Sequence, residues 1–214
     1  MDNFKKKLII VNEKDEIIGT KMAWNGHLLP KPILHRAFSV FAFDKNNRLL
    51  IQKRAKEKRV FPGLWANTCC SHPFINPRSF IDPIGDAKSH AIARLEYEMG
   101  ITGINESDLH FHGRILYKAI PNEEWGEQKG KDIPIQKYED FNSENEILEE
   151  ENGFGEYEMD YIFVLTKPVS PVPRKSEVED WKYITKDELA KLNGIVPWVR
   201  IIMGMYDVFE MVNH

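Results

Sequence analysis

Long apolar runs and an excess of basic residues are both missing from this 214-residue sequence. The apolar run at residues 8–11 follows three lysines but has only four residues, far short of a signal-peptide core. Nothing approaches the roughly 18 apolar residues of a membrane span. The net charge of -4 and the pI of about 6.0 argue against a nucleic-acid partner. We therefore expect a soluble, cytoplasmic protein that binds neither membranes nor nucleic acids.

Cysteine is scarce, and both cysteines, Cys69 and Cys70, lie in the stretch NTCCSHP at residues 67–73. Neighbouring Cα atoms are about 3.8 Å apart, closer than an ordinary disulfide allows, so we predict two reduced thiols. The stretch still admits a zinc site that includes His72, a reactive thiol, or small core residues beside an imidazole. A zinc module is disfavoured because adjacent cysteines chelate one ion poorly and no second CxxC is present.

The rest of the composition is that of one folded domain spanning 1–214, with 42% hydrophobic residues to form a core. Strand patterns occupy 7–12, 17–20, 38–44, 48–55, 109–120 and 158–166, and helix patterns occupy 86–99, 185–192 and 197–212. Residues 38–55 form a predicted hairpin, and the strand at 158–166 is predicted to be central because it is apolar on both faces beyond Asp160. This mixture predicts an α/β sandwich.

Helix boundaries are marked by local signals. Ala87, Ala91, Leu95 and Met99 recur every four residues, and Gly100 follows as the expected C-cap. Three prolines predict an irregular segment before residue 86. In the second helix Thr185 and Glu188 form a predicted capping box, and Pro197 is placed to begin the last helix.

The segment 121–153 differs from the rest because acidic residues far outnumber basic ones and its apolar residues are scattered. We interpret it as a polar, acidic insertion at the surface, partly mobile, with one short helix near residues 143–151.

Two carboxylates, Glu156 and Glu158, stand two residues apart at the entry to the strand predicted to be central, so both face the same side. Burying such a pair is costly unless a cation or protons neutralise it. The alternative is a solvated strand end.

Among the histidines, His72 follows the cysteine pair, and His27 and His35 flank a proline-containing loop. His110 and His112 lie in a more polar segment, and we interpret them as surface residues. Imidazoles with carboxylates and no obligatory thiolate suit a divalent ion such as Zn, Mn or Mg.

The basic residues Arg54, Lys58 and Arg94 are candidates for an anion site of the kind that clamps phosphates. A solvated run of charges is the alternative interpretation for the first two.

Seven stretches occur in order along the chain: LHRAFSVFAFD, LLIQKRA, FPGLWANTCCSHP, RLEYEMGI, LYKA, GEYEMDYI and VPW. Together they closely resemble the type I isopentenyl diphosphate:dimethylallyl diphosphate isomerases, which belong to the Nudix superfold. The resemblance runs from about residue 5 to the C-terminus and excludes the insertion. It implies a Nudix-type mixed β-sheet sandwiched between helices, with extra N-terminal strands and a C-terminal helix.

The general Nudix box, G-x5-E-x7-REUxEExGU, is only partly present. Its leading glycine falls on Ser79 and its first glutamate on Gly85, and its core reads ARLEYE at residues 93–98. Glu98 alone remains of the carboxylates that cluster hydrolytic magnesium ions. This loss argues against the alternative function, a Nudix diphosphohydrolase.

The resemblance also implies a site. Its metal ligands are His27, His35, His72, Glu156 and Glu158, and Glu98 holds Mg²⁺ with the substrate diphosphate. Its diphosphate-binding residues are Arg54, Lys58, Arg94 and Lys21, the last at a spacing to His27 two residues longer than is usual in the family. Neither a flavin nor a nicotinamide is expected, and the chain is expected to be a monomer or a weak homodimer.

The reaction implied by the resemblance is an allylic proton shift through a tertiary carbocation, which needs an acid, a base and a dry pocket. Cys70 and Glu158 match the two catalytic positions, and Tyr117 matches a tyrosine that hydrogen-bonds the carboxyl group. In the forward direction the Glu158/Tyr117 pair is expected to protonate the alkene, and the Cys70 thiolate to remove the allylic proton. Trp198 matches the tryptophan whose π face covers the cation, and Cys69 is left as a core residue.

Overall fold

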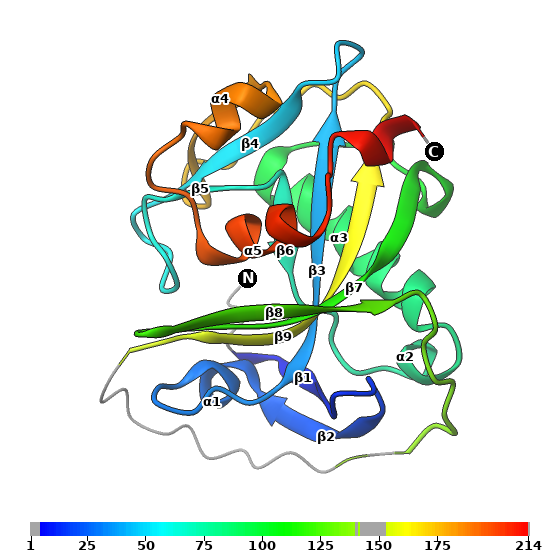
Figure 1. The fold of residues 1–214 in the computed structure, drawn as a ribbon. Coiled ribbons are helices and arrows are strands. Elements are labelled where there is room, and N and C mark those ends of the chain that lie inside the picture. The colour runs from blue at the N-terminus through cyan, green and yellow to red at the C-terminus, as the bar shows by residue number, and fades with distance from the viewer. Residues whose placement is uncertain (1–4, 140, 142–152, 214) are drawn as a thin grey trace.

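A mixed β-sheet runs through the molecule, with helices on both of its faces (Figure 1). The computed structural model describes residues 5–139, 141 and 153–213. The main path of the sheet has the order β10-β4-β3-β9-β7-β8, and the strands β1, β2, β5 and β6 attach to it through β3 and β4. This architecture agrees with the α/β class and the mixed sheet expected from the sequence.

The strands follow the predicted patterns closely in the centre of the sheet. Their bounds are β1 Lys7–Val11, β2 Ile17–Met22, β3 His35–Phe43, β4 Leu49–Arg54, β5 Trp65–Ala66, β6 Cys69–Ser71, β7 Leu109–Ile120, β8 Glu123–Gly130, β9 Glu156–Leu165 and β10 Val178–Ile184. The predicted hairpin is β3–β4, and β9 lies between β3 and β7 as expected for a strand that is apolar on both faces. The β3–β9 pair is parallel, whereas the other strand pairs are antiparallel.

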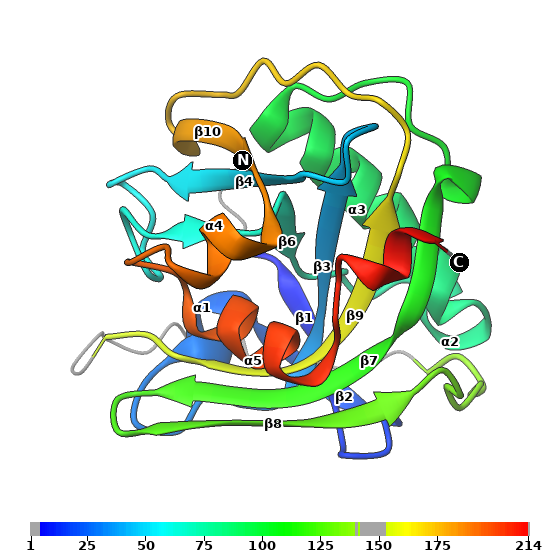
Figure 2. The same cartoon turned by 45° about the horizontal axis from the view of Figure 1, so that its top comes forward.

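The long helix α3, Pro83–Met99, covers one face of the sheet (Figure 2). Its predicted apolar stripe, Ala87, Ala91, Leu95 and Met99, is fully buried, and Gly100 ends the helix with a φ of 62°. The irregular segment expected before residue 86 is present at residues 72–77, but the expectation is wrong for the residues that follow. The short helix α2, Arg78–Ile81, lies there, and α3 begins three residues early because Pro83 occupies its first position, where no N–H is needed.

The other face carries α4, Lys186–Ala190, and α5, Pro197–Met205. The capping box between Thr185 and Glu188 is present as predicted. The last helix ends at Met205, whereas the sequence pattern had predicted residues 197–212. Tyr206 is extended, and the next apolar residues, Val208 and Phe209, turn into the core before the short 3-10 helix Glu210–Asn213.

Two edge strands were not predicted. The strand β8 lies inside the segment expected to be an irregular insertion, and it pairs with β7 along most of its length. Because its residues are mostly exposed at the sheet edge, acidic and polar side chains are tolerated there. At the opposite edge β10 pairs with β4. The predicted short helix at 143–151 lies outside the described residues.

The N-terminal hairpin β1–β2 leads into the short helix α1, Ala23–His27. A buried carboxylate, Asp15, fastens the hairpin to the rest of the sheet. It accepts hydrogen bonds from Arg36 of β3 at 2.6 Å, and from Arg114 of β7 and the Tyr161 hydroxyl of β9 at 2.7 Å each. The position of α1, and therefore of His27, is tied in this way to the three strands at the centre of the fold.

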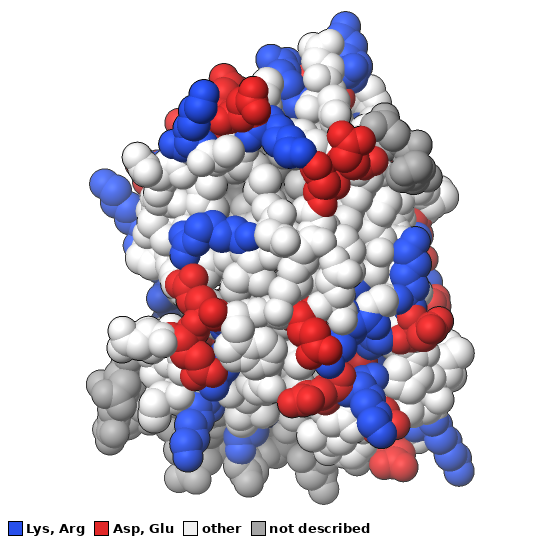
Figure 3. Space-filling model, viewed as in Figure 1, with Lys and Arg blue, Asp and Glu red and all other residues white. Residues whose placement is uncertain are grey.

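Charges are mixed on the surface of the face seen in Figure 1, where Figure 3 shows acidic and basic side chains interspersed among larger areas of other residues. In the described part of the chain, no helix combines the length and apolar character that a bilayer span requires.

Candidate active site

The start of β9 brings together residues from three strands. Glu158 pairs in register with His35 on β3 and with Tyr117 on β7. Side chains directly across neighbouring strands lie about 5 Å apart, so Glu158 is placed between an imidazole and a phenol. The Tyr117 hydroxyl donates to Glu158 Oε2 at 2.5 Å.

Five side chains converge beside this position. Each offers one donor atom, and these atoms all lie within 4.8 Å of one another: His27, His35, His72, Glu156 and Glu158. They come from α1, the start of β3, the residue after β6 and the start of β9. The structure thus brings together the ligand set that the sequence predicted. Neither cysteine belongs to this group.

Backbone carbonyls fix the orientation of two imidazoles. His27 Nδ1 lies 2.6 Å from the Ala23 carbonyl, and His35 Nδ1 lies 2.6 Å from the Ile33 carbonyl. Because a carbonyl only accepts, each Nδ1 must donate, and a neutral ring then presents its Nε2 lone pair to the cluster. This arrangement is typical of metal-ligating histidines.

Two polar atoms of the cluster have no hydrogen-bond partner in the described part of the chain. Among the described residues, the buried atoms His35 Nε2 and Glu156 Oε2 make no hydrogen bond. Burial, together with the neighbouring charge of Glu158, raises the pKa of Glu156 to about 7, and burial lowers the pKa of His72 to about 4. Buried ligand atoms without hydrogen-bond partners, neutral imidazoles and closely spaced carboxylates all fit a site that holds a divalent metal ion.

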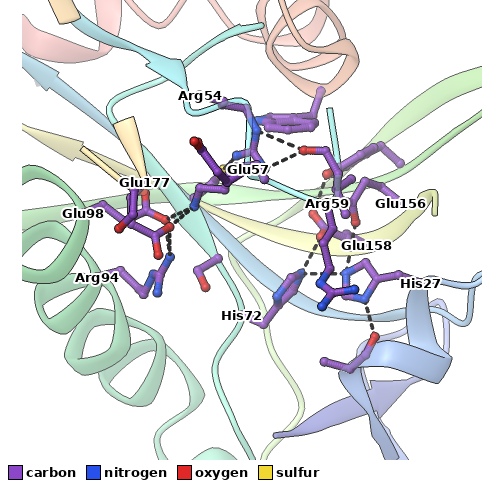
Figure 4. Close-up of a pocket in the computed structure, with 18 residues that line it drawn as sticks. His27, Arg54, Glu57, Arg59, His72, Arg94, Glu98, Glu156, Glu158 and Glu177 are labelled. Atoms are coloured by element: carbon purple, nitrogen blue, oxygen red, sulfur yellow. Dashed lines mark hydrogen bonds and ion pairs between the residues drawn. The ribbon is translucent and has the colours of Figure 1, made fainter. Parts of the chain in front are cut away.

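Four members of the cluster, His27, His72, Glu156 and Glu158, line a cavity of about 230 Å³. Its lining residues include Ala23, His27, Arg54, Glu57, Lys58, Arg59, Val60, Cys70, Ser71, His72, Arg94, Glu98, Tyr117, Glu156, Glu158, Ser176, Glu177 and Trp198. Figure 4 shows two polar groups on opposite sides of the pocket, with Arg94, Glu98 and Glu177 on one side and the imidazoles and carboxylates on the other.

The two cysteines point to different environments. Cys69 is fully buried in the core cluster that contains the α3 stripe, whereas Cys70 lines the cavity and packs against the cluster that contains Trp198. This separation follows from strand alternation in β6. Burial raises the pKa of the Cys70 thiol to about 12, and its Sγ lies 3.9 Å from Arg54 Nη1.

Asn67 connects the cysteine strand to the indole. Its side-chain amide donates to the carbonyls of Val40 and Cys69, at 3.1 and 2.9 Å, and its oxygen accepts from Trp198 Nε1 at 3.0 Å. The Arg54 guanidinium lies over the Trp198 ring, 5.5 Å from its centroid. The first residue of the NTCCSHP stretch therefore positions both the Cys70 strand and the aromatic wall.

The polar group on the opposite side of the pocket consists of two cations that share two carboxylates. Lys58 donates to Glu98 at 2.8 Å and also contacts Glu177, and Arg94 contacts the same two carboxylates. Burial opposes ionisation of Glu98, but Lys58 and Arg94 outweigh it and hold its pKa far below the ordinary range. The three cations proposed from the sequence, the third being Arg54, do converge on one pocket.

Replacing Glu98 by glutamine should lower the free energy of unfolding by an amount that depends on pH. A depressed folded pKa contributes stability above the ordinary value of 4.5, and this contribution is lost as the pH falls. In EDTA at pH 7 we expect Glu98→Gln to lower the free energy of unfolding by about 2 kcal/mol, since two cations lose a buried partner. Urea unfolding at pH 7 and pH 3 tests this, and an equal loss at both pH values would contradict it.

One predicted residue is not brought to the site. Lys21 lies in β2 opposite Leu8 and is not among the residues that line the cavity. The residue two positions further on, where the usual spacing to His27 falls, is Ala23, and it does line the cavity. Glu57, Arg59 and Glu177 were missed by the sequence analysis, although Arg59 directly follows the predicted Lys58.

Comparison with known proteins shows the family to which this chain belongs. Residues 33–203 match the NUDIX domain. Isopentenyl-diphosphate Delta-isomerase 1 of Mesocricetus auratus is 34% identical over 96% of this chain and 85% of that protein. Isopentenyl-diphosphate Delta-isomerase I of Camptotheca acuminata is 32% identical over 99% of this chain and 84% of that protein. The chain belongs to the isopentenyl-diphosphate Delta-isomerase family.

Members of the isopentenyl-diphosphate Delta-isomerase family share the Nudix fold with more distant proteins. DR0079 from Deinococcus radiodurans has a TM-score of 0.51 at 15% identity, and the match covers 97% of this chain and 98% of that one. At this identity the match shows the fold alone.

In helix α3 this chain differs from the general Nudix box. Arg94 and Tyr97 stand where the box has glutamates, and Arg94 contacts Glu98 while its guanidinium lies 5.0 Å from the Tyr97 ring centroid. A positive charge therefore replaces a carboxylate beside the one box glutamate that remains.

Proposed function

We propose that this protein interconverts isopentenyl diphosphate and dimethylallyl diphosphate by moving a proton across the allylic unit. The observation that carries the proposal is the cavity lined by Cys70, Glu158, Tyr117 and Trp198 beside the five-residue donor cluster. Family membership supports it, because the relatives are named as isomerases of isopentenyl diphosphate.

Cys70 and the Glu158/Tyr117 pair are the proposed proton-transfer groups. In the forward direction Glu158 gives its proton to the terminal alkene carbon, a tertiary carbocation forms, and Cys70 removes a proton from the carbon next to the diphosphate-bearing one. Each forward turnover then leaves Cys70 protonated and Glu158 negatively charged. The reverse reaction uses the same groups with their roles exchanged.

The surroundings of these two groups favour the protonation states from which the reverse reaction starts. Burial keeps the Cys70 thiol protonated. Burial raises the pKa of Glu158, but hydrogen bonds to His35 and His72 outweigh this effect and hold the pKa well below its usual range. The next forward turnover requires Glu158 to regain a proton and Cys70 to lose one.

His27, His35, His72, Glu156 and Glu158 would hold a divalent metal ion, with Zn, Mn and Mg as the candidates. Bound there, the ion would supply a positive charge that fixes the Glu158 carboxylate and lowers its affinity for a proton. Glu98 is the proposed residue that holds Mg²⁺ with the substrate diphosphate, and Lys58 and Arg94 would turn from Glu98 and Glu177 toward the phosphate oxygens.

Trp198 is the proposed stabiliser of the carbocation, and its ring already lies under a guanidinium. A desolvated cation–π contact of about 2 kcal/mol corresponds to about 30-fold in rate. Trp198→Leu should therefore lower kcat by about 30-fold, and Trp198→Phe by clearly less, because phenylalanine keeps a π face. Both variants lose the bond to Asn67, so equal losses in steady-state kcat would contradict the assignment.

Hydrolysis of a diphosphate is the competing function. The positive charge of Arg94 beside Glu98 opposes the clustering of several magnesium ions there. Incubation with isopentenyl diphosphate and Mg²⁺, followed by ³¹P and ¹H NMR, separates the two functions. Isomerisation yields dimethylallyl diphosphate with the diphosphate intact, whereas release of inorganic phosphate without it would refute the proposal.

The identity of the metal, the cytoplasmic location, the monomeric or weakly dimeric state and the single-domain organisation of residues 1–214 stay predictions from the sequence.

A further inference from the structure

A buried glutamine of β4 contacts the proposed magnesium ligand from the side of the core. Gln52 is fully buried and is not among the residues that line the cavity. Its side-chain nitrogen, Nε2, donates to Glu98 Oε2 at 3.1 Å and to the Thr68 carbonyl at 3.0 Å. Gln52 therefore connects the sheet to the carboxylate that α3 brings to the cavity.

The two carboxylate oxygens of Glu98 have different surroundings. Oε1 accepts from Lys58 at 2.8 Å and contacts Arg94, and both of these cations line the cavity. Figure 4 shows Glu98 beside Arg94 on one side of the pocket. Oε2 accepts from Gln52, and the Cys69 thiol, a weak donor, lies 3.8 Å from the same oxygen. Because Gln52 and Cys69 are both fully buried, Oε1 is the oxygen on the cavity side and Oε2 is turned to the core.

A glutamine is a costly residue at this position. Its Oε1 is a buried acceptor that makes no hydrogen bond among the described residues, so this atom loses its water without gaining a partner. The three preceding residues of β4, Leu49, Leu50 and Ile51, are buried and apolar. A methionine would fill similar space without an unpaired polar atom. The presence of glutamine therefore points to a role for its amide donor.

A magnesium ion fits the cavity-side oxygen of Glu98. In sites that bind phosphates, Mg²⁺ is usually held by one or two carboxylates together with the phosphate oxygens. Glu98 offers such a carboxylate on the wall that also carries Lys58 and Arg94, two of the cations proposed to bind the diphosphate. Because Mg²⁺ demands nearly ideal octahedral geometry, a carboxylate that is held in one orientation should bind it better than one that can rotate.

We propose that Gln52 is a positioning residue for the Mg²⁺ ion that accompanies the substrate: by holding Oε2 of Glu98, it leaves Oε1 as the oxygen that binds the ion. This inference rests on the proposed isomerase function, in which Glu98 holds Mg²⁺ with the diphosphate. Gln52 acts through Glu98, and the proton transfers remain with Cys70 and Glu158.

Titration with inorganic pyrophosphate, once with Mg²⁺ and once in EDTA, tests the proposal without requiring turnover. With Mg²⁺ we expect Gln52→Met to weaken pyrophosphate binding about tenfold, because Glu98 loses the hydrogen bond that orients it. In EDTA the affinity should stay close to that of the wild type, because the lining cations Arg54, Lys58 and Arg94 are unchanged.

Steady-state kinetics give a second readout. With Mg²⁺ the KM of Gln52→Met for isopentenyl diphosphate should rise by a factor similar to the loss of pyrophosphate affinity. Its kcat should change little, as for an interaction that is equally strong in the ground state and the transition state.

Gln136→Met is the matched control because it makes the same substitution away from the cavity. Gln136 is partly buried, its Oε1 accepts from the Ile17 amide at 2.6 Å, and it is not a lining residue. Its replacement removes a hydrogen bond of the fold and should leave pyrophosphate binding unchanged in both conditions. The metal content of the five-residue cluster should equal that of the wild type in both variants, because neither glutamine belongs to that cluster.

A crystal structure of the wild-type protein with Mg²⁺ and pyrophosphate tests the geometry directly. We expect the ion to be bound by Glu98 Oε1, with Oε2 still accepting from Gln52. A Mg²⁺ ion bound through Oε2, or through both oxygens, would overturn the inference. This measurement does not depend on whether Gln52→Met folds.

The outcomes for the variant are distinct from those for the isomerase proposal. If Gln52→Met binds pyrophosphate with Mg²⁺ as tightly as the wild type, the inference is overturned. If its affinity falls equally with Mg²⁺ and in EDTA, Gln52 is only a structural link between β4 and α3, and the inference is also overturned. Both results leave the function standing, whereas absence of isomerisation by the wild-type protein refutes the function itself.

Discussion

Replacing Cys70 by alanine is expected to lower kcat by at least about 10³-fold, within the range of a lost general acid or base. The thiol lines the cavity, and no other thiol replaces it there among the described residues. Cys70→Ser keeps the size of the side chain but changes its acidity, so it should also be strongly impaired. Steady-state kinetics with isopentenyl diphosphate, and binding of the substrate to the inactive variants, measure the effect.

Cys69→Ala is the matched control because it changes the same side chain one residue away. Cys69 is fully buried on the opposite face of β6, with its Sγ 3.8 Å from Glu98 Oε2. Its loss should cost about 1 kcal/mol of stability and leave kcat close to that of the wild type. Equal losses of kcat in Cys69→Ala and Cys70→Ala would refute the assignment of the thiol.

Glu158→Gln is expected to lower kcat by at least about 10³-fold as well. The amide can still form hydrogen bonds with His72 and Tyr117, which now lie 2.8 and 2.5 Å from the carboxylate oxygens, but it cannot exchange a proton with the alkene. Because the loss is chemical, added divalent metal should not restore the rate.

Glu156→Gln provides the comparison for the metal cluster. Glu156 stands two residues before Glu158 on the same face of β9 and belongs to the same donor group. Its replacement should weaken metal binding at least about tenfold, and excess metal should restore much of the activity. Two measurements separate Glu156→Gln from Glu158→Gln: the metal content by elemental mass spectrometry, and kcat at saturating metal. Restoration of Glu158→Gln by metal would contradict its role in proton transfer.

The sequence predicts the centre of this fold well because its signals are local and mutually consistent. Beyond Asp160 strand β9 is apolar on both faces, and the α3 stripe repeats every four residues, so periodicity alone places both. Alternation along β9 puts Glu156 and Glu158 on one face, and alternation in β6 separates Cys69 from Cys70. These features need no knowledge of distant contacts.

The edges of the fold were harder to predict because tertiary contacts decide them. The acidic strand β8 has a weak strand pattern and is formed through its pairing with β7. The end of α5 is set by the burial of Val208 and Phe209, although the apolar pattern continues beyond Met205. In the site, Arg59 was missed because its approach to Trp24 joins residues 35 positions apart in the sequence, a contact that spacing does not reveal.

Deuterium incorporation from the solvent tests the central claim most directly. In deuterated buffer with Mg²⁺ and isopentenyl diphosphate, the proton added to the terminal alkene carbon comes from Glu158 after exchange with solvent. We predict dimethylallyl diphosphate with deuterium in a methyl group, formed by wild type and by Cys69→Ala but not by Cys70→Ala. Product without deuterium, or free phosphate with no dimethylallyl diphosphate, would contradict proton transfer at this site.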